Sequence, residues 1–167
     1  MREYNDYALT VRRWLRSYHQ FHVTIENLGD DIETLEKLNR LDVAAPISKY
    51  GDTPRGGTPE LNSVESAAAR HIARAGQIDE KRRSIETISL TLRKLDRAIS
   101  CLPEIERRLA VGHFTEGLSW EELGNEFGYT EKWARTHGGQ AIRQLAAMLF
   151  GDRAQGGKKP HAFVFAV

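Results

Sequence analysis

Apolar residues recur at alternating spacings of four and three along two long stretches, and this pattern constrains the fold more than any other feature. The first stretch lies within residues 1–42 and contains Trp14, Tyr18, Phe21, Ile25, Leu28, Ile32 and Leu35. The second lies within residues 63–102 and contains Ile78, Ile85, Ile88, Leu92, Leu95, Ile99 and Leu102. Such spacing is typical of a coiled-coil seam. We predict two long antiparallel helices, because neither stripe can be buried without a partner helix in the same chain or another copy.

The segment between these stripes breaks the periodicity. It contains PISKYGDTPRGGTP, which holds three of the five prolines, and we predict a loop at about 45–60 that joins the two helices. An alternative is that Arg55 forms an arm that reaches a DNA groove or a polymerase. The glycines here lack the lysine–serine ending of a phosphate-binding loop, so nucleotide hydrolysis is not indicated.

Helix start and stop signals are dense in residues 118–145. Ser119 with Glu122 three positions later is a capping box, and Gly128 suits the left-handed position that ends a helix. Thr130 can then cap a second helix. The predicted inward positions of that helix are Ala134, His137, Ala141 and Leu145. Two helices joined by a tight turn form a helix-turn-helix, and Pro103 can begin a further helix just before it.

The outward positions at the start of the second predicted helix suit contact with DNA. A recognition helix meets base edges with its first residues, and Lys or Arg there can donate to guanine O6/N7 or to phosphate. For Trp133 two interpretations stay open: contact with a thymine methyl group, or cover of the domain core. The predicted DNA-binding residues are Thr130, Glu131, Lys132, Trp133, Arg135, Thr136 and Arg143, the last of them on phosphate.

At these residues the sequence resembles a known family. The stretch LSWEELGNEFGYTEKWARTHGGQAIRQL is similar to region 4 of bacterial sigma factors, without a gap from Ser119 to Leu145. Over residues 9–148 the chain resembles small phage-encoded sigma-like regulators of Gram-positive hosts, of the late-gene activator type. The resemblance implies that Lys132, Arg135 and Thr136 contact bases.

Three features depart from the family pattern. Glu131 matches an often basic position, and His137 stands where the family usually has an aliphatic residue. Gly138 and Gly139 lie in the middle of the predicted helix, where each costs about 1 kcal/mol relative to Ala. Either the helix bends there or something packs very close to it.

Composition limits the remaining classes. With 24 basic and 23 acidic residues the net charge is +1, so DNA affinity must come from a local patch. The single cysteine, Cys101, excludes an internal disulfide, and the chain has neither a secretory signal nor a long apolar run. We therefore expect a cytoplasmic protein without membrane contact, and the resemblance implies that the cell is the bacterial host. No catalytic constellation is present, and we expect no enzyme, cofactor or metal, since His19 and His22 lack further ligands.

These predictions combine into one organisation: an all-α chain with a helical arm at 1–102, a helix-turn-helix domain at 103–150 and a tail at 151–167. One recognition helix binds DNA weakly, so we expect a homo-oligomer through the long helices, or docking on host RNA polymerase. The predicted function is a sequence-specific regulator that binds double-stranded DNA, with the activator role implied by the resemblance. Two alternatives stay open: a component of DNA packaging similar to a small terminase subunit, and a module that binds polymerase without touching bases.

Overall fold

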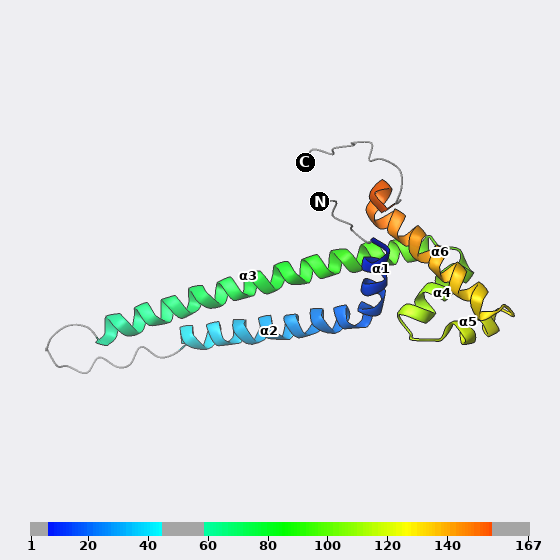
Figure 1. The fold of residues 1–167 in the computed structure, drawn as a ribbon. Coiled ribbons are helices and arrows are strands. Elements are labelled where there is room, and N and C mark those ends of the chain that lie inside the picture. The colour runs from blue at the N-terminus through cyan, green and yellow to red at the C-terminus, as the bar shows by residue number, and fades with distance from the viewer. Residues whose placement is uncertain (1–6, 45–58, 155–167) are drawn as a thin grey trace, which may run out of the picture. The chain divides into compact units, whose positions relative to one another are not determined.

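The computed structural model of the protein describes residues 7–44 and 59–154. Over these residues the chain forms six α-helices and a short 3-10 helix, with no β-strand (Figure 1). The elements are α1 (Tyr7–Arg16), α2 (Tyr18–Ala44), α3 (Pro59–Ser100), α4 (Glu104–Phe114), α5 (Trp120–Glu126), α6 (Glu131–Phe150) and η1 (Gly151–Ala154). The predicted all-α class is confirmed. Arg55 and most of the predicted loop lie outside the described residues, as does most of the predicted tail.

The chain divides into two compact units. Unit 1 contains α1, α2 as far as His22, α3 from Leu90 onward, and α4 to α6, whereas unit 2 contains the described residues between Val23 and Ser89. Unit 1 thus includes the segment that we assigned to a helix-turn-helix domain together with both ends of the segment that we assigned to an arm. The functional division at residues 102 and 103 stays a prediction.

The prediction of one continuous helix over residues 1–42 is wrong at Ser17. The helix is interrupted there between α1 and α2, although the Ser17 amide still donates to the carbonyl of Arg13 at 3.0 Å. The reason is a change of packing partner. Val11 and Leu15 of α1 are fully buried in a cluster with residues of α3 and α6, so α1 follows a core that the seam pattern does not specify.

The core of unit 1 forms where several helices meet α6. Its buried residues are Val11, Leu15, Leu95, Ala98, Leu102, Ala110, Phe114, Ala141, Ile142, Leu145 and Ala146. Phe150 at the end of α6 closes one side, with ring centroids 4.8 Å from Tyr7 and 5.5 Å from Trp14. A smaller cluster of Leu109, Leu123 and Ala134 joins α4, α5 and the start of α6. These two clusters fix α6 against α1 and α4.

Unit 2 is an antiparallel pair made by α2 and α3 (Figure 1). Ile78 is its only buried hydrophobic residue among those described. Ion pairs connect the two helices: Asp42 with Arg74, Asp31 with Lys81 at 2.7 Å, and Glu36 with Arg82 at 2.9 Å. The predicted seam residues Ile25, Leu28, Ile32, Ile85 and Ile88 are half-buried.

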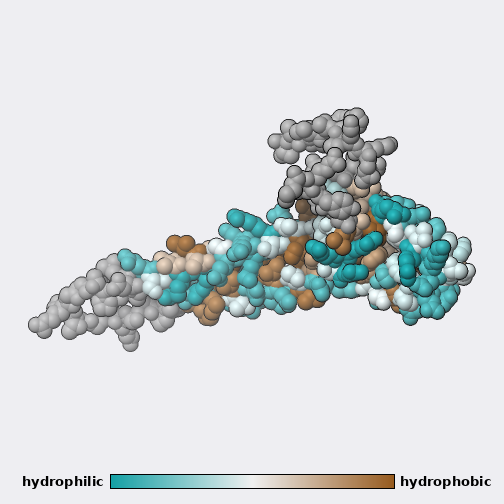
Figure 2. Space-filling model, in the orientation of Figure 1, coloured by the Kyte–Doolittle hydropathy of each residue, from teal (hydrophilic) through white to brown (hydrophobic). Residues whose placement is uncertain are grey.

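Apolar side chains also reach the surface of unit 2. Figure 2 shows them among polar ones along the helices. Leu41 is 66% exposed and Ile72 is 72% exposed. The described parts of α2 and α3 therefore leave these two side chains exposed, and the predicted coiled-coil packing with another copy stays a prediction.

Candidate nucleic-acid interface

The start of α5 is held by a reciprocal pair of hydrogen bonds. The Ser119 hydroxyl oxygen accepts from the Glu122 amide at 3.1 Å, and the Glu122 carboxylate accepts from the Ser119 amide at 2.8 Å. The predicted capping box is confirmed. The backbone N–H and the hydroxyl of Ser119 hold the pKa of Glu122 below its ordinary value, because both donate to the carboxylate.

The turn between α5 and α6 depends on two glycines. Gly128 has a φ of 74°, which confirms the predicted left-handed position. Gly124 is the second of these glycines, and its side of α5 is closely approached by backbone atoms. A Cβ at Gly124 would lie 2.8 Å from the carbonyl oxygen of Tyr129, so the close neighbour is the backbone of the turn itself.

The start of α6 is capped as predicted, and the middle of the helix has a close neighbour. The Thr130 hydroxyl oxygen accepts from the Trp133 amide at 3.3 Å. A Cβ at Gly138 would lie 2.3 Å from the ring of Trp120, whereas one at Gly139 would meet nothing within 4 Å. The helix runs without interruption to Phe150. Close packing is therefore the reason for a glycine at position 138.

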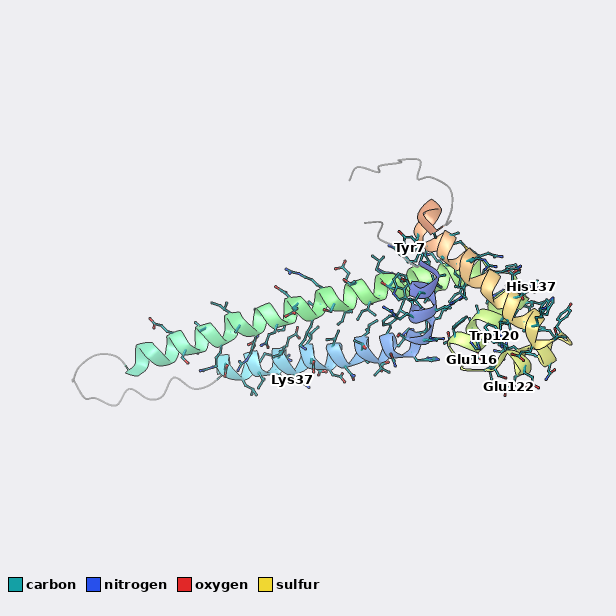
Figure 3. All side chains as sticks on the ribbon, viewed as in Figure 1. Tyr7, Lys37, Glu116, Trp120, Glu122 and His137 are labelled. Carbon is teal, nitrogen blue, oxygen red and sulfur yellow. The ribbon has the colours of Figure 1, made fainter. Side chains whose placement is uncertain are left out.

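Trp120 owes its position to an aromatic cluster on α4. Its ring stacks on His113 with centroids 3.8 Å apart and meets the ring of Phe114 edge-on at 5.9 Å. The Nδ1 atom of His113 is 2.7 Å from the carbonyl oxygen of Leu118, which fixes the imidazole in turn. Figure 3 shows Trp120 and His137 in the group of side chains around α5 and α6.

The outward residues at the start of α6 are exposed, as predicted: Glu131, Lys132, Arg135 and Thr136. These side chains differ in whether they form ion pairs or hydrogen bonds within the protein. Arg135 forms an ion pair with Glu131 one turn earlier, and the Thr136 hydroxyl donates to the carbonyl of Lys132 at 2.8 Å. Within the described ranges, no carboxylate forms an ion pair with Lys132 or with the exposed Arg143. Among the described residues, Lys132 is therefore a cation beside the turn without an ion-pair partner.

Trp133 lies between two other rings. It stacks on Tyr129 with centroids 3.9 Å apart and planes at 16°, and on His137 at 4.0 Å and 29°. The ring is half-buried and packs against the small cluster that contains Leu109 and Leu123. With both faces covered, Trp133 can offer a base only its edge. This geometry favours core cover over contact of the ring face with a thymine methyl group.

Tyr129 is a candidate that our sequence reasoning missed. It is 46% exposed and lies at the outer end of the stack with Trp133 and His137. The three rings are four residues apart in the sequence, and this repeated spacing was the available signal. Stacking on Trp133 holds the exposed Tyr129 ring in the turn before α6.

The surrounding segment is not basic. Residues 103–150 hold five basic and seven acidic side chains. Arg108 lies between Glu116 at 2.6 Å and Glu126 at 2.9 Å, and these carboxylates raise the pKa of Arg108 above its ordinary value. Such a segment does not attract DNA through net charge, so an interface must be local to the start of α6.

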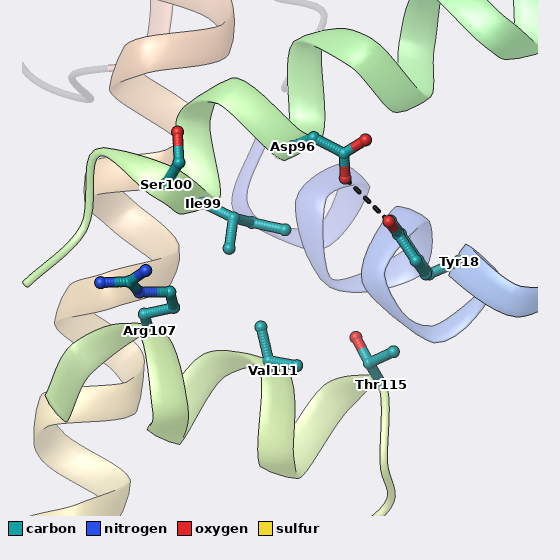
Figure 4. A pocket seen from close by; sticks show the side chains of 7 residues that line it. All are labelled: Tyr18, Asp96, Ile99, Ser100, Arg107, Val111 and Thr115. Carbon is teal, nitrogen blue, oxygen red and sulfur yellow. Dashed lines mark hydrogen bonds between the residues drawn. The ribbon is translucent and has the colours of Figure 1, made fainter. Parts of the chain in front are cut away.

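A groove of about 250 Å³ lies elsewhere in unit 1 (Figure 4). Its lining residues are Tyr18, Asp96, Ile99, Ser100, Arg107, Val111 and Thr115. The Tyr18 hydroxyl donates to Asp96 at 2.9 Å, and burial together with the Asp96 carboxylate raises the pKa of Tyr18. The groove contains none of the predicted DNA-binding residues.

Comparisons with protein-family models, with curated proteins and with solved structures find no match to this chain. Within residues 7–44 and 59–154, no helix has the length and apolar character to cross a membrane. The same part of the chain brings no three His, Cys, Asp or Glu side chains together as a metal site. His19 and His22 instead meet the edge of the Tyr18 ring, with centroids at 5.8 Å and 5.1 Å.

Proposed function

We propose that the protein is a sequence-specific regulator of transcription that binds double-stranded DNA with the start of α6. One observation carries the proposal: two helices with side-chain caps, α5 and α6, are joined by residues 127–130 and leave Lys132, Arg135 and Thr136 exposed. In a helix-turn-helix, residues at this position enter the major groove. Lys132 and Arg135 can each donate to guanine, and a good bidentate contact discriminates by about 1 to 3 kcal/mol.

The sigma-like sequence pattern supports a role at a promoter. Ser119, Gly128 and Thr130, which mark the helix boundaries in that pattern, have the local structures that it requires. The late-gene activator role, the phage origin and the setting in the cytoplasm of a bacterial host follow from the resemblance. Contact with host RNA polymerase follows from it as well.

Self-association is the second part of the proposal. A single recognition helix binds DNA weakly at physiological salt, and the half-buried seam of unit 2 offers apolar surface to another copy. Two copies would present two recognition helices to half-sites about 34 Å apart or multiples of that distance. Light scattering at micromolar concentration tests this, and a monomeric mass would contradict it.

The function is tested by selecting bound fragments of the source genome with purified protein at near-physiological salt. A Lys132→Ala/Arg135→Ala variant is compared with Arg40→Ala/Arg83→Ala, which removes the same charge from unit 2 and breaks none of the ion pairs between α2 and α3. We expect one promoter-proximal site to be enriched by the wild type and the control, and lost in the α6 variant. Enrichment near packaging genes would instead favour the terminase-like function. Equal behaviour of both variants would overturn base reading by α6.

A further inference from the structure

The segment that is proposed to bind DNA has few free cations. Arg135 is paired with Glu131, and Arg108 is held by two carboxylates. The side chains left for phosphates on α4 to α6 are Arg107, Lys132 and Arg143. DNA-binding proteins commonly make about six to ten phosphate contacts, and these supply much of their affinity. Another part of the molecule that is fixed to α6 can supply further contacts.

Helix α1 has the required charge. Its sequence, YALTVRRWLR, holds three arginines and no acidic residue. Arg12, Arg13 and Arg16 are exposed on one side, and Val11 and Leu15 are fully buried on the other. At 100° per residue the three arginines span about one quarter of the helix circumference. No carboxylate in the described part of the chain forms an ion pair with them.

This arginine face, defined as Arg12, Arg13 and Arg16, is attached to α6 through a rigid core. Val11 and Leu15 share a buried cluster with Ile142 and Leu145. Ile142 is ten residues beyond Lys132, which corresponds to about 15 Å along the helix axis. The major groove is about 12 Å wide, and rows of phosphates flank it on both sides. The separation of Lys132 and Ile142 along α6 is thus comparable to the distance between base edges in the groove and the flanking phosphates.

Arg16 connects the face to α4 and, through it, to the start of α5. Its guanidinium carbon lies over the ring of Phe114, 5.6 Å from the centroid. Phe114 is the last residue of α4 and contacts Trp120, the first residue of α5. One end of the arginine face therefore lies close to the start of α5, where helix-turn-helix proteins cross the DNA backbone.

We propose that the arginine face of α1 binds backbone phosphates of the same DNA duplex whose bases α6 contacts. This inference rests on the proposed function and adds a second contact surface to it. The contacts are independent of sequence, because phosphates carry no base identity. They raise affinity and its dependence on salt, and they leave the preference between sites unchanged.

The test is the salt dependence of binding of the full chain to its selected site. An Arg12→Gln/Arg13→Gln/Arg16→Gln variant is compared with Lys37→Gln/Arg40→Gln/Arg83→Gln, which removes equal charge from unit 2 and breaks none of the ion pairs between α2 and α3. Each lost phosphate contact lowers the slope of log K against log salt by about 0.9, so we expect the α1 variant to lose about 2 to 3 in slope. The control should keep the wild-type slope, and both variants should keep the ratio of affinities for selected and scrambled sites.

An unchanged salt slope in the α1 variant, or an equal fall in slope in the control, would overturn the inference. The proposed function would still stand in that case if the wild type preferred its selected site over a scrambled one. A wild type that binds no DNA at any salt concentration would overturn both. An Arg12→Lys/Arg13→Lys/Arg16→Lys variant separates charge from folding. It should keep the wild-type slope, and a loss of slope despite retained charge would contradict phosphate binding by this face.

Discussion

The two units use a similar apolar pattern and reach different degrees of burial. The large side chains that are fully buried all belong to unit 1: Val11, Leu15, Leu95, Leu109, Leu123, Ile142 and Leu145. Unit 2 has the same spacing of apolar residues, but its helices meet only each other and bury Ile78 alone among the residues described. Apolar periodicity thus specifies helices in both places, whereas a core forms where more than two helices converge.

The largest loss of stability should come from truncating a buried side chain in the core of unit 1. Leu145→Ala removes a fully buried side chain from the convergence of α1, α3 and α6, and we expect a loss of about 2 to 5 kcal/mol. Ile78→Ala should cost less, because the two-helix unit can close over the space or admit water. Hydrogen exchange resolved by segment measures each unit separately. An equal loss of protection in both would show that unit 2 has a core as well defined as that of unit 1.

The next effect contrasts two adjacent glycines on α6. Gly138→Ala places a methyl group against Trp120, whose ring is held by His113 and Phe114, so we expect a loss of about 1 to 3 kcal/mol from overpacking. Gly139→Ala has open space and should stabilise the helix by up to about 1 kcal/mol. Thermal unfolding of both variants tests this. A gain in both would mean that the Trp120 ring moves aside easily.

The glycine pair illustrates what could be predicted from the sequence. Ser119, Gly128 and Thr130 follow rules that involve neighbours within a few positions, and their local structures were predicted correctly. The sequence also posed the choice at Gly138 between a bend and a close contact. Trp120 could not be predicted as the neighbour of Gly138, because the two residues are 18 positions apart in the sequence.

Tertiary packing also explains the error at Ser17 and the missed role of α1. Trp14 fits the heptad spacing, and its ring packs on Phe150 of α6. Val11 and Leu15, which are not in the predicted seam, are the residues that α1 buries. The predicted stripe along residues 1–42 includes neither Val11 nor Leu15, so it gives no reason to single out the arginines on the opposite side of α1.

A smaller effect is expected from the cap of α5. Ser119→Ala removes the hydroxyl that accepts from the Glu122 amide, and we expect a loss of about 1 kcal/mol in the stability of unit 1. Glu122→Gln keeps the size of the side chain and weakens the reciprocal bond to the Ser119 amide. Urea unfolding of both variants at neutral pH measures the two halves of the box. If Ser119→Ala is as stable as the wild type, tertiary packing of Leu123 holds this helix start without the cap.

Low pH should destabilise unit 2 clearly and should have the smallest effect on the stability of unit 1. The Arg74 guanidinium holds the pKa of Asp42 below its ordinary value, as Lys37 does for Glu33. A lowered pKa in the folded state means that the stabilisation is present at neutral pH and is lost as the pH falls below about 4. Hydrogen exchange should therefore increase first in residues 23–44 and 59–89, while the buried core of unit 1 keeps its protection.

An Asp42→Asn variant sharpens this comparison. It cannot ionise, so unit 2 should exchange faster than in the wild type at neutral pH, and the difference should shrink as acid protonates Asp42 in the wild type. Residues 90–150 should be unaffected at any pH. If the two proteins differ equally at neutral and acid pH, the loss comes from packing or the hydrogen bond to Arg74. The stability of unit 2 would then depend on packing, as that of unit 1 does, rather than on ion pairs between α2 and α3.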